Sequence, residues 1–82
     1  MNALEQAQRA RIAELNGGEI TREVLTEKYG RVYTTAELQE YFQVEGFLAP
    51  WVVVKRKSDG KRGSLEFTAS PRFYFNFKVD EP

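Results

Sequence analysis

Residues 51–67 read WVVVKRKSDGKRGSLEF, and this stretch decides the fold that the sequence predicts. Trp51–Lys57, with its β-branched run Val52–Val54, and Gly63–Ala69 fit the period of two expected of strands with one buried face. Asp59-Gly60, between the two runs, is a dipeptide typical of tight hairpin turns. The stretch therefore predicts two antiparallel strands joined in a β-hairpin.

The register of this hairpin follows from the turn. If the turn has two residues, Val54 lies across from Leu65, and both face the same side of the sheet. The same register sets Lys57 across from Arg62, and directly opposed like charges destabilise a sheet. A longer loop opened at Gly63 would relieve this repulsion, so the exact pairing is left open.

The last predicted strand, Arg72–Val79, alternates without interruption. Its phenylalanines point to one side, toward the core, whereas Tyr74 points to the opposite side, and whether Tyr74 is exposed is left open. The predicted core draws on all three strands and consists of Val52, Val54, Leu65, Phe67, Phe73, Phe75 and Phe77.

Helical periodicity and capping residues predict short helices in the N-terminal half. Residues 3–15 carry a thin apolar stripe at helical spacing. Thr21 is the predicted N-cap of a second helix that ends at Gly30. Thr34 and Glu37 have the spacing of a capping box, which predicts the start of a third helix.

Together these elements predict a single α+β domain over residues 1–82. Residues 1–42 are expected to be mainly helical, and residues 43–79 to form an antiparallel sheet. The expected architecture is two or three short N-terminal helices packed on a three- or four-stranded antiparallel sheet with a basic β-hairpin. A length of 82 residues allows one modest core, with a net stability of only a few kcal/mol.

The composition excludes much chemistry. The chain has no cysteine and no histidine, which removes thiolate metal sites, cysteine nucleophiles and every triad built on imidazole. Carboxylate pairs at helical spacing are read as solvated helix faces. We therefore expect no enzyme activity, no catalytic residue, no metal and no cofactor. The N-terminus lacks the pattern of a signal peptide and the longest apolar run is short, so we expect a cytoplasmic protein without a membrane partner.

Charge is distributed unevenly along a chain whose formal net charge is zero. Residues 1–50 carry eight acids and five bases, whereas residues 51–82 carry seven bases and four acids. Cations on a projecting hairpin suit phosphate contacts, and an exposed tyrosine offers a face for base stacking. The predicted nucleic-acid contacts are Lys55, Arg56, Lys57, Lys61 and Arg62, supported by Arg72, Tyr74 and Lys78. The competing interpretation is a charged tip that only confers solubility.

A rival hypothesis is a regulator or inhibitor that binds a host protein. The same cations would then meet an acidic protein surface, or Trp51 and the thin first helix would serve as an apolar anchor. Core or rim packing is the alternative role for Trp51. The uneven first helix and the aromatic last strand also leave room for a homo-oligomer.

A winged-helix arrangement is a further alternative. Thr34–Phe42 followed by Gln43–Gly46 has the form of a first helix and turn, with the hairpin as the wing. A recognition helix would then have to cross Pro50 and the β-branched run Val52–Val54, which favour extended structure.

Residues 44–77, with GFLAPWVVVKRKSDG, GSLEF and SPRFYFNF, resemble short uncharacterised accessory proteins of bacteriophages, cyanobacterial phages in particular. The resemblance covers under half of the chain and carries no catalytic motif. It implies a viral or prophage accessory protein, for which binding to host components is a common purpose.

Overall fold

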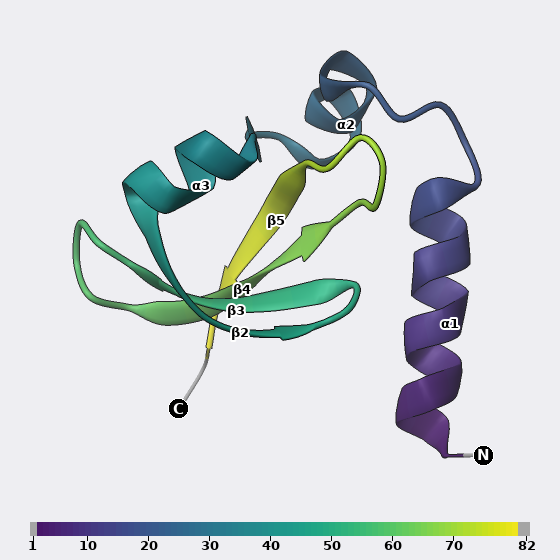
Figure 1. Cartoon of the computed structure of the whole chain (residues 1–82), viewed down its shortest axis with the longest axis horizontal. Helices are drawn as coiled ribbons and strands as arrows, with labels where there is room; N and C mark the ends of the chain where they lie inside the picture. The colour runs from purple at the N-terminus through teal and green to yellow at the C-terminus, as the bar shows by residue number, and fades with distance from the viewer. Residues whose placement is uncertain (1, 81–82) are drawn as a thin grey trace.

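The computed structural model describes residues 2–80, which are organised around a five-stranded antiparallel sheet (Figure 1). The strand order is β1-β5-β4-β3-β2. The strands are β1 (Val32–Tyr33), β2 (Phe42–Leu48), β3 (Trp51–Arg56), β4 (Arg62–Phe67) and β5 (Tyr74–Val79). The predicted α+β class is confirmed. The extra strand is β1, which comes from the helical half of the chain and pairs with β5.

Three helices precede most of the sheet: α1 (Ala3–Asn16), α2 (Arg22–Tyr29) and α3 (Thr35–Tyr41). The predicted caps of α2 and α3 are confirmed. The Thr21 hydroxyl accepts a hydrogen bond from the backbone N–H of Val24, and Thr34 forms a complete capping box with Glu37. These bonds satisfy N–H groups that have no partner within a helix, so local sequence is enough to start both helices.

The winged-helix alternative is wrong, because β2 begins at Phe42, directly after α3 ends. Gln43–Gly46, read as the turn of a helix-turn-helix, lies within β2 and pairs with β3. No recognition helix follows α3 within the described chain, up to residue 80. The β-branched run of β3 prefers the sheet, where its side chains pack on a pleated surface.

The β3–β4 hairpin forms with a register two residues away from the predicted one. Val52 lies across from Leu65, and Lys55 rather than Lys57 lies across from Arg62. The strands are joined by a loop of residues 57–61 in place of a two-residue turn. Asp59 organises this loop, because its carboxylate accepts hydrogen bonds from the Arg56 guanidinium and from the backbone N–H of Lys61. A shift of two residues keeps each side chain on its predicted face.

Gly63 is a residue of strand β4, and the loop that joins the strands ends before it, at Lys61. It lies in β4 across from Val54 on one side and Val79 on the other. A Cβ atom built at this position would lie 2.3 Å from the backbone oxygen of Lys78 and 2.8 Å from the Phe77 ring. The close approach of β5 and the Phe77 ring therefore requires glycine here.

The predicted alternation along β5 is wrong, because the strand is interrupted at Asn76. Asn76 has a φ of 59°, and the register between β4 and β5 shifts by one residue at this point. A β-bulge of this kind reverses which face the following side chains occupy. As a result Tyr74 and Phe77 lie on one face of the sheet, and Phe75 lies on the other.

The sheet thus has a hydrophobic cluster on each face. On the face covered by α3, Tyr74 is buried together with Leu38, Phe42, Val52, Val54 and Leu65. On the other face, Phe75 is buried with Leu15 of α1, Leu25 of α2 and Val32. All seven predicted core residues are buried or partly buried, but they are divided between these two clusters.

Helix α1 lies beside the ends of the strands and extends past the turn between β2 and β3 (Figure 1). Its apolar stripe is mostly unused: Leu15 is buried, whereas Leu4 is 51% and Ile12 is 37% exposed. Polar contacts hold the helix instead, including a hydrogen bond of 2.9 Å from the Gln8 amide to the backbone oxygen of Ala49. No helix within residues 2–80 has the length and apolar character needed to cross a membrane.

Candidate functional sites on the two faces of the sheet

The predicted basic cluster is divided between the two faces of the sheet. Arg56 lies on the α3 face, where its guanidinium sits 5.1 Å from the centre of the Phe77 ring. Lys57 is on the same side and donates a hydrogen bond of 2.7 Å to the backbone oxygen of Gln39. Lys55 and Arg62 lie on the opposite face, across from each other on β3 and β4. Alternation along the strands separates neighbours in sequence, which a count of charges does not reveal.

Two of the five hairpin cations are neutralised by carboxylates. Arg56 pairs with Asp59 at 2.6 Å, and Arg62 pairs with Glu45 at 2.6 Å. The hydrogen bond from Arg56, followed by that from the backbone N–H of Lys61, lowers the pKa of Asp59 to about 2. Among residues 2–80, the ammonium groups of Lys55 and Lys61 make no hydrogen bond or ion pair.

Three further predicted site residues lie away from the hairpin tip. Tyr74 is only 2% exposed, which makes the prediction of a base-stacking surface at this residue wrong. Tyr74 comes before the bulge, and its ring is buried because α3 covers this face of the sheet. Its hydroxyl lies 3.5 Å from that of Thr35. Arg72 sits over the Phe67 ring, at the opposite end of β4 from the hairpin loop. Lys78 is exposed on β5, across from Ser64.

A basic pocket of about 350 Å³ opens on the α3 side of the sheet, beside the hairpin loop. Its lining residues come from the segment before β1, from α3 and from the hairpin: Arg31, Tyr33, Glu40, Tyr41, Phe42, Arg56, Lys57 and Ser58. Three of them are cations and one is a carboxylate. The pocket therefore combines the two chemistries, positive charge and aromatic faces, that the sequence indicated only for the hairpin and Tyr74.

Arg31 is the residue of this pocket that sequence reasoning missed. Its guanidinium lies 4.9 Å from the centre of the Tyr33 ring and 4.9 Å from that of Tyr41. Within the described chain it makes no hydrogen bond or ion pair, so its N–H groups remain free for an anion. No local signal identifies Arg31 as a site residue. Its second ring, Tyr41, is ten positions away, and Arg56, which lines the same pocket, is twenty-five positions away.

A second pocket, called the tryptophan pocket below, has a volume of about 300 Å³ and opens on the other face of the sheet. Its lining residues come from α1 and from three adjacent strands: Arg11, Trp51, Ser64, Glu66, Asn76 and Lys78. Glu66 lies directly across from Trp51, and Ser64 across from Lys78, which places these side chains next to one another. The predicted anchor, Trp51, is half-buried at this site.

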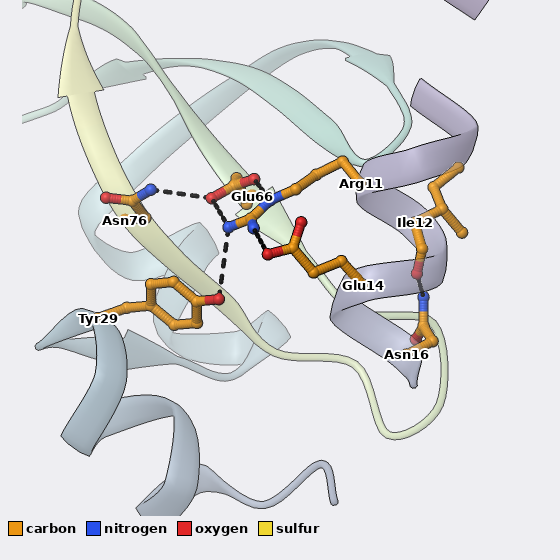
Figure 2. A network of polar contacts seen from close by, with 7 residues as sticks. All are labelled: Arg11, Ile12, Glu14, Asn16, Tyr29, Glu66 and Asn76. Carbon is orange, nitrogen blue, oxygen red and sulfur yellow. Dashed lines mark hydrogen bonds and ion pairs between the residues drawn. The ribbon is translucent and has the colours of Figure 1, made fainter. Parts of the chain in front are cut away.

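The back of the tryptophan pocket is a buried ion pair. Figure 2 shows Arg11 reaching from α1 to Glu66 on β4, with Asn76 and Tyr29 both on the side away from α1. Two hydrogen bonds, of 2.5 and 2.8 Å, join the Arg11 guanidinium to the Glu66 carboxylate, which accepts a third of 2.8 Å from the Asn76 amide. Among the described residues, every buried side-chain nitrogen and oxygen has a partner.

The protonation state of Glu66 follows from these contacts. Burial of the carboxylate acts to raise its pKa, but the hydrogen bonds from Arg11 and Asn76 outweigh burial and leave the pKa below its ordinary value of 4.5. Hydrogen bonding to Glu66 raises the pKa of Arg11. Both groups are therefore charged at neutral pH, and Glu66 does not have the raised pKa expected of a general acid.

Comparison of the chain with protein-family models, curated proteins and solved structures finds no match. The chemistry of the two pockets is therefore the basis for assigning a function. Within residues 2–80, no group of three acidic side chains converges in a way that could hold a metal ion.

Proposed function

We propose that the protein is a non-enzymatic, cytoplasmic nucleic-acid-binding protein that holds a single strand at the basic pocket and the adjoining hairpin loop. Proteins that bind single strands without reading sequence combine cations that follow the backbone with aromatic rings on which bases stack. The basic pocket supplies both, with Arg31 and Lys57 as cations that have no carboxylate partner among the described residues and the 41%-exposed Tyr41 as a ring.

The observation that carries this proposal is the placement of Arg31. Its guanidinium is held over two tyrosine rings and has no carboxylate partner among the described residues. A cation oriented in this way is preorganised for phosphate, because little side-chain freedom is lost when the anion binds. Lys57 lines the same pocket from the hairpin, and Lys61 follows in the loop, so a strand leaving the pocket continues along positive charge.

The proposal is tested by fluorescence anisotropy of labelled single-stranded DNA and RNA over a series of salt concentrations. Binding through phosphates should weaken linearly with the logarithm of salt concentration. The variant Arg31→Gln/Lys57→Gln should bind more weakly. The slope of log binding constant against log salt concentration should become shallower by about 0.7 for each phosphate contact removed.

A matched control is Lys28→Gln/Arg72→Gln, which also removes one lysine and one arginine. Both control residues are exposed and lie outside the basic pocket. This variant should keep the wild-type salt slope. Absence of binding to both polymers at low salt, or an equal loss in the control, would show that the proposal is wrong.

A second function is supported by a different observation. Phe47 and Leu48, at the end of the edge strand β2, are 58% and 47% exposed, and Leu4 of α1 is similarly exposed. Large apolar side chains on an open edge favour contact with a protein. We propose a phage-type regulator that binds a host protein as the alternative function, with Phe47 and Leu48 taking the anchoring role predicted for Trp51.

This alternative is tested by affinity capture from a bacterial lysate with the wild-type protein and with Phe47→Ser/Leu48→Ser. A true partner should be retained in stoichiometric amount by the wild type and lost from the variant. The variant Ile12→Ser changes another exposed apolar residue and serves as the control. Retention of the same partner by all three proteins would exclude a role for β2.

A further inference from the structure

The tryptophan pocket contains an aromatic ring that the fold leaves unused. Trp51 is half-buried, yet within residues 2–80 its indole ring contacts no other aromatic ring and its Nε1–H has no hydrogen-bond acceptor. Every buried side-chain nitrogen among the described residues has a partner, so this N–H is not buried and is open to solvent. The ring thus presents an apolar face and a free donor to a cavity of about 300 Å³, at the lower end of the range for small-molecule sites.

The polar groups of the pocket fall into two sets. Arg11 and Glu66 bind each other and form a fixed wall. Lys78 and Ser64, by contrast, make no side-chain hydrogen bond or ion pair with any described residue. Asn76 uses one N–H to reach Glu66 and keeps its amide oxygen and second N–H. Most of the free groups are donors, and one of them is a cation.

We infer that the tryptophan pocket binds a small planar aromatic anion, with its ring on Trp51 and its negative group at Lys78 and Ser64. A flat ring matches the exposed indole face, and a phosphate or carboxylate matches a free ammonium group beside a hydroxyl donor. Hydrogen bonds between Arg11 and Glu66 hold this wall of the pocket in one arrangement, so less side-chain freedom is lost when a ligand binds. The site goes beyond the proposed function, because it opens on the opposite face of the sheet from the basic pocket.

Trp51 is the only tryptophan in the chain, so its emission reports directly on this site. The probes are adenosine 5′-monophosphate, adenosine and ribose 5-phosphate, titrated into the full chain with selective excitation of tryptophan. Stacking on the indole should make adenosine 5′-monophosphate a saturable quencher. Adenosine lacks the anion and ribose 5-phosphate lacks the ring, so each should bind at least about 10-fold more weakly.

Two lysine variants locate the anion. Lys78→Ala should weaken the binding of adenosine 5′-monophosphate by about 10-fold or more, as expected when a hydrogen bond to a charged group is lost. Lys78→Arg should restore most of the affinity. Lys28→Ala removes the same charge at an exposed position outside both pockets and should leave the affinity unchanged. Far-ultraviolet circular dichroism checks that each variant is folded.

The result that supports the inference is saturable quenching that depends on Lys78 and not on Arg31. Three results would overturn it: no change in Trp51 emission, equal affinity for wild type and Lys78→Ala, or loss of quenching in Arg31→Gln. The last would place the nucleotide in the basic pocket, which would favour the proposed function while removing this site.

Discussion

Removal of Arg11 should destabilise the protein far more than removal of a surface arginine. Arg11 and Glu66 form a bidentate pair whose side chains are 21% and 8% exposed. In Arg11→Met, Glu66 would remain buried with only the Asn76 hydrogen bond. Breaking a buried pair from one side costs about 3–5 kcal/mol, and the remaining amide contact places this case near about 3 kcal/mol.

That loss is large for a domain of 82 residues. A change of about 3 kcal/mol corresponds to a fall in the melting temperature of roughly 12–24 °C. The assay is urea unfolding at neutral pH followed by circular dichroism, with the midpoint and slope fitted separately. The control is Arg62→Met, which removes an exposed pair with Glu45 and should change stability very little.

The double variant Arg11→Met/Glu66→Met separates charge burial from lost packing. Replacing both members of a buried pair with apolar residues is often neutral, so most of the lost stability should return. The reasoning from a buried and unpaired charge is refuted by either of two results. Arg11→Met could lower the free energy of unfolding no more than Arg62→Met does, or the double variant could be as unstable as Arg11→Met.

Two further predictions concern the sheet. Gly63→Ala should lower stability by about 1–3 kcal/mol, measured by thermal unfolding, because its Cβ would collide with the Lys78 backbone and the Phe77 ring; Gly18→Ala, with open space around it, is the control. Acidification should reduce the difference in stability between wild type and Glu66→Gln as the pH falls below 4.5. The folded state holds the pKa of Glu66 below its ordinary value, so the unfolded state takes up the proton first and is favoured by acid. An advantage that stays constant down to pH 2 would contradict this pKa.

Features that depend on neighbouring residues in the sequence were predicted well. The threonine caps of α2 and α3, the end of α2 at Gly30 and the hairpin of residues 51–67 all follow from interactions a few residues apart. The seven predicted core residues are all buried or partly buried, because apolar residues repeat with the period of their element, but Tyr74 is buried against the prediction. The hairpin register was not, because Asp59 favours a longer loop through its bonds to Arg56 and Lys61.

The candidate sites depended on contacts that no local pattern encodes. Arg31, Tyr41 and Arg56 meet only because α3 lies over one face of the sheet, and Arg11 meets Glu66 only because α1 lies beside the strands. The bulge at Asn76 also acted here, since one extra residue in β5 set Phe77 on the same face of the sheet as Tyr74.

The sequence by itself determined the helix starts, the antiparallel hairpin, the apolar residues of the core and the absence of thiol and imidazole chemistry, because each depends on residue type or short-range spacing. Tertiary structure alone decided which cations share a face, which tyrosines remain exposed and where Trp51 meets Lys78. The physical reason is that strand alternation and a single bulge sort side chains to opposite sides of a sheet, and charge acts through distance in space rather than through position along the chain.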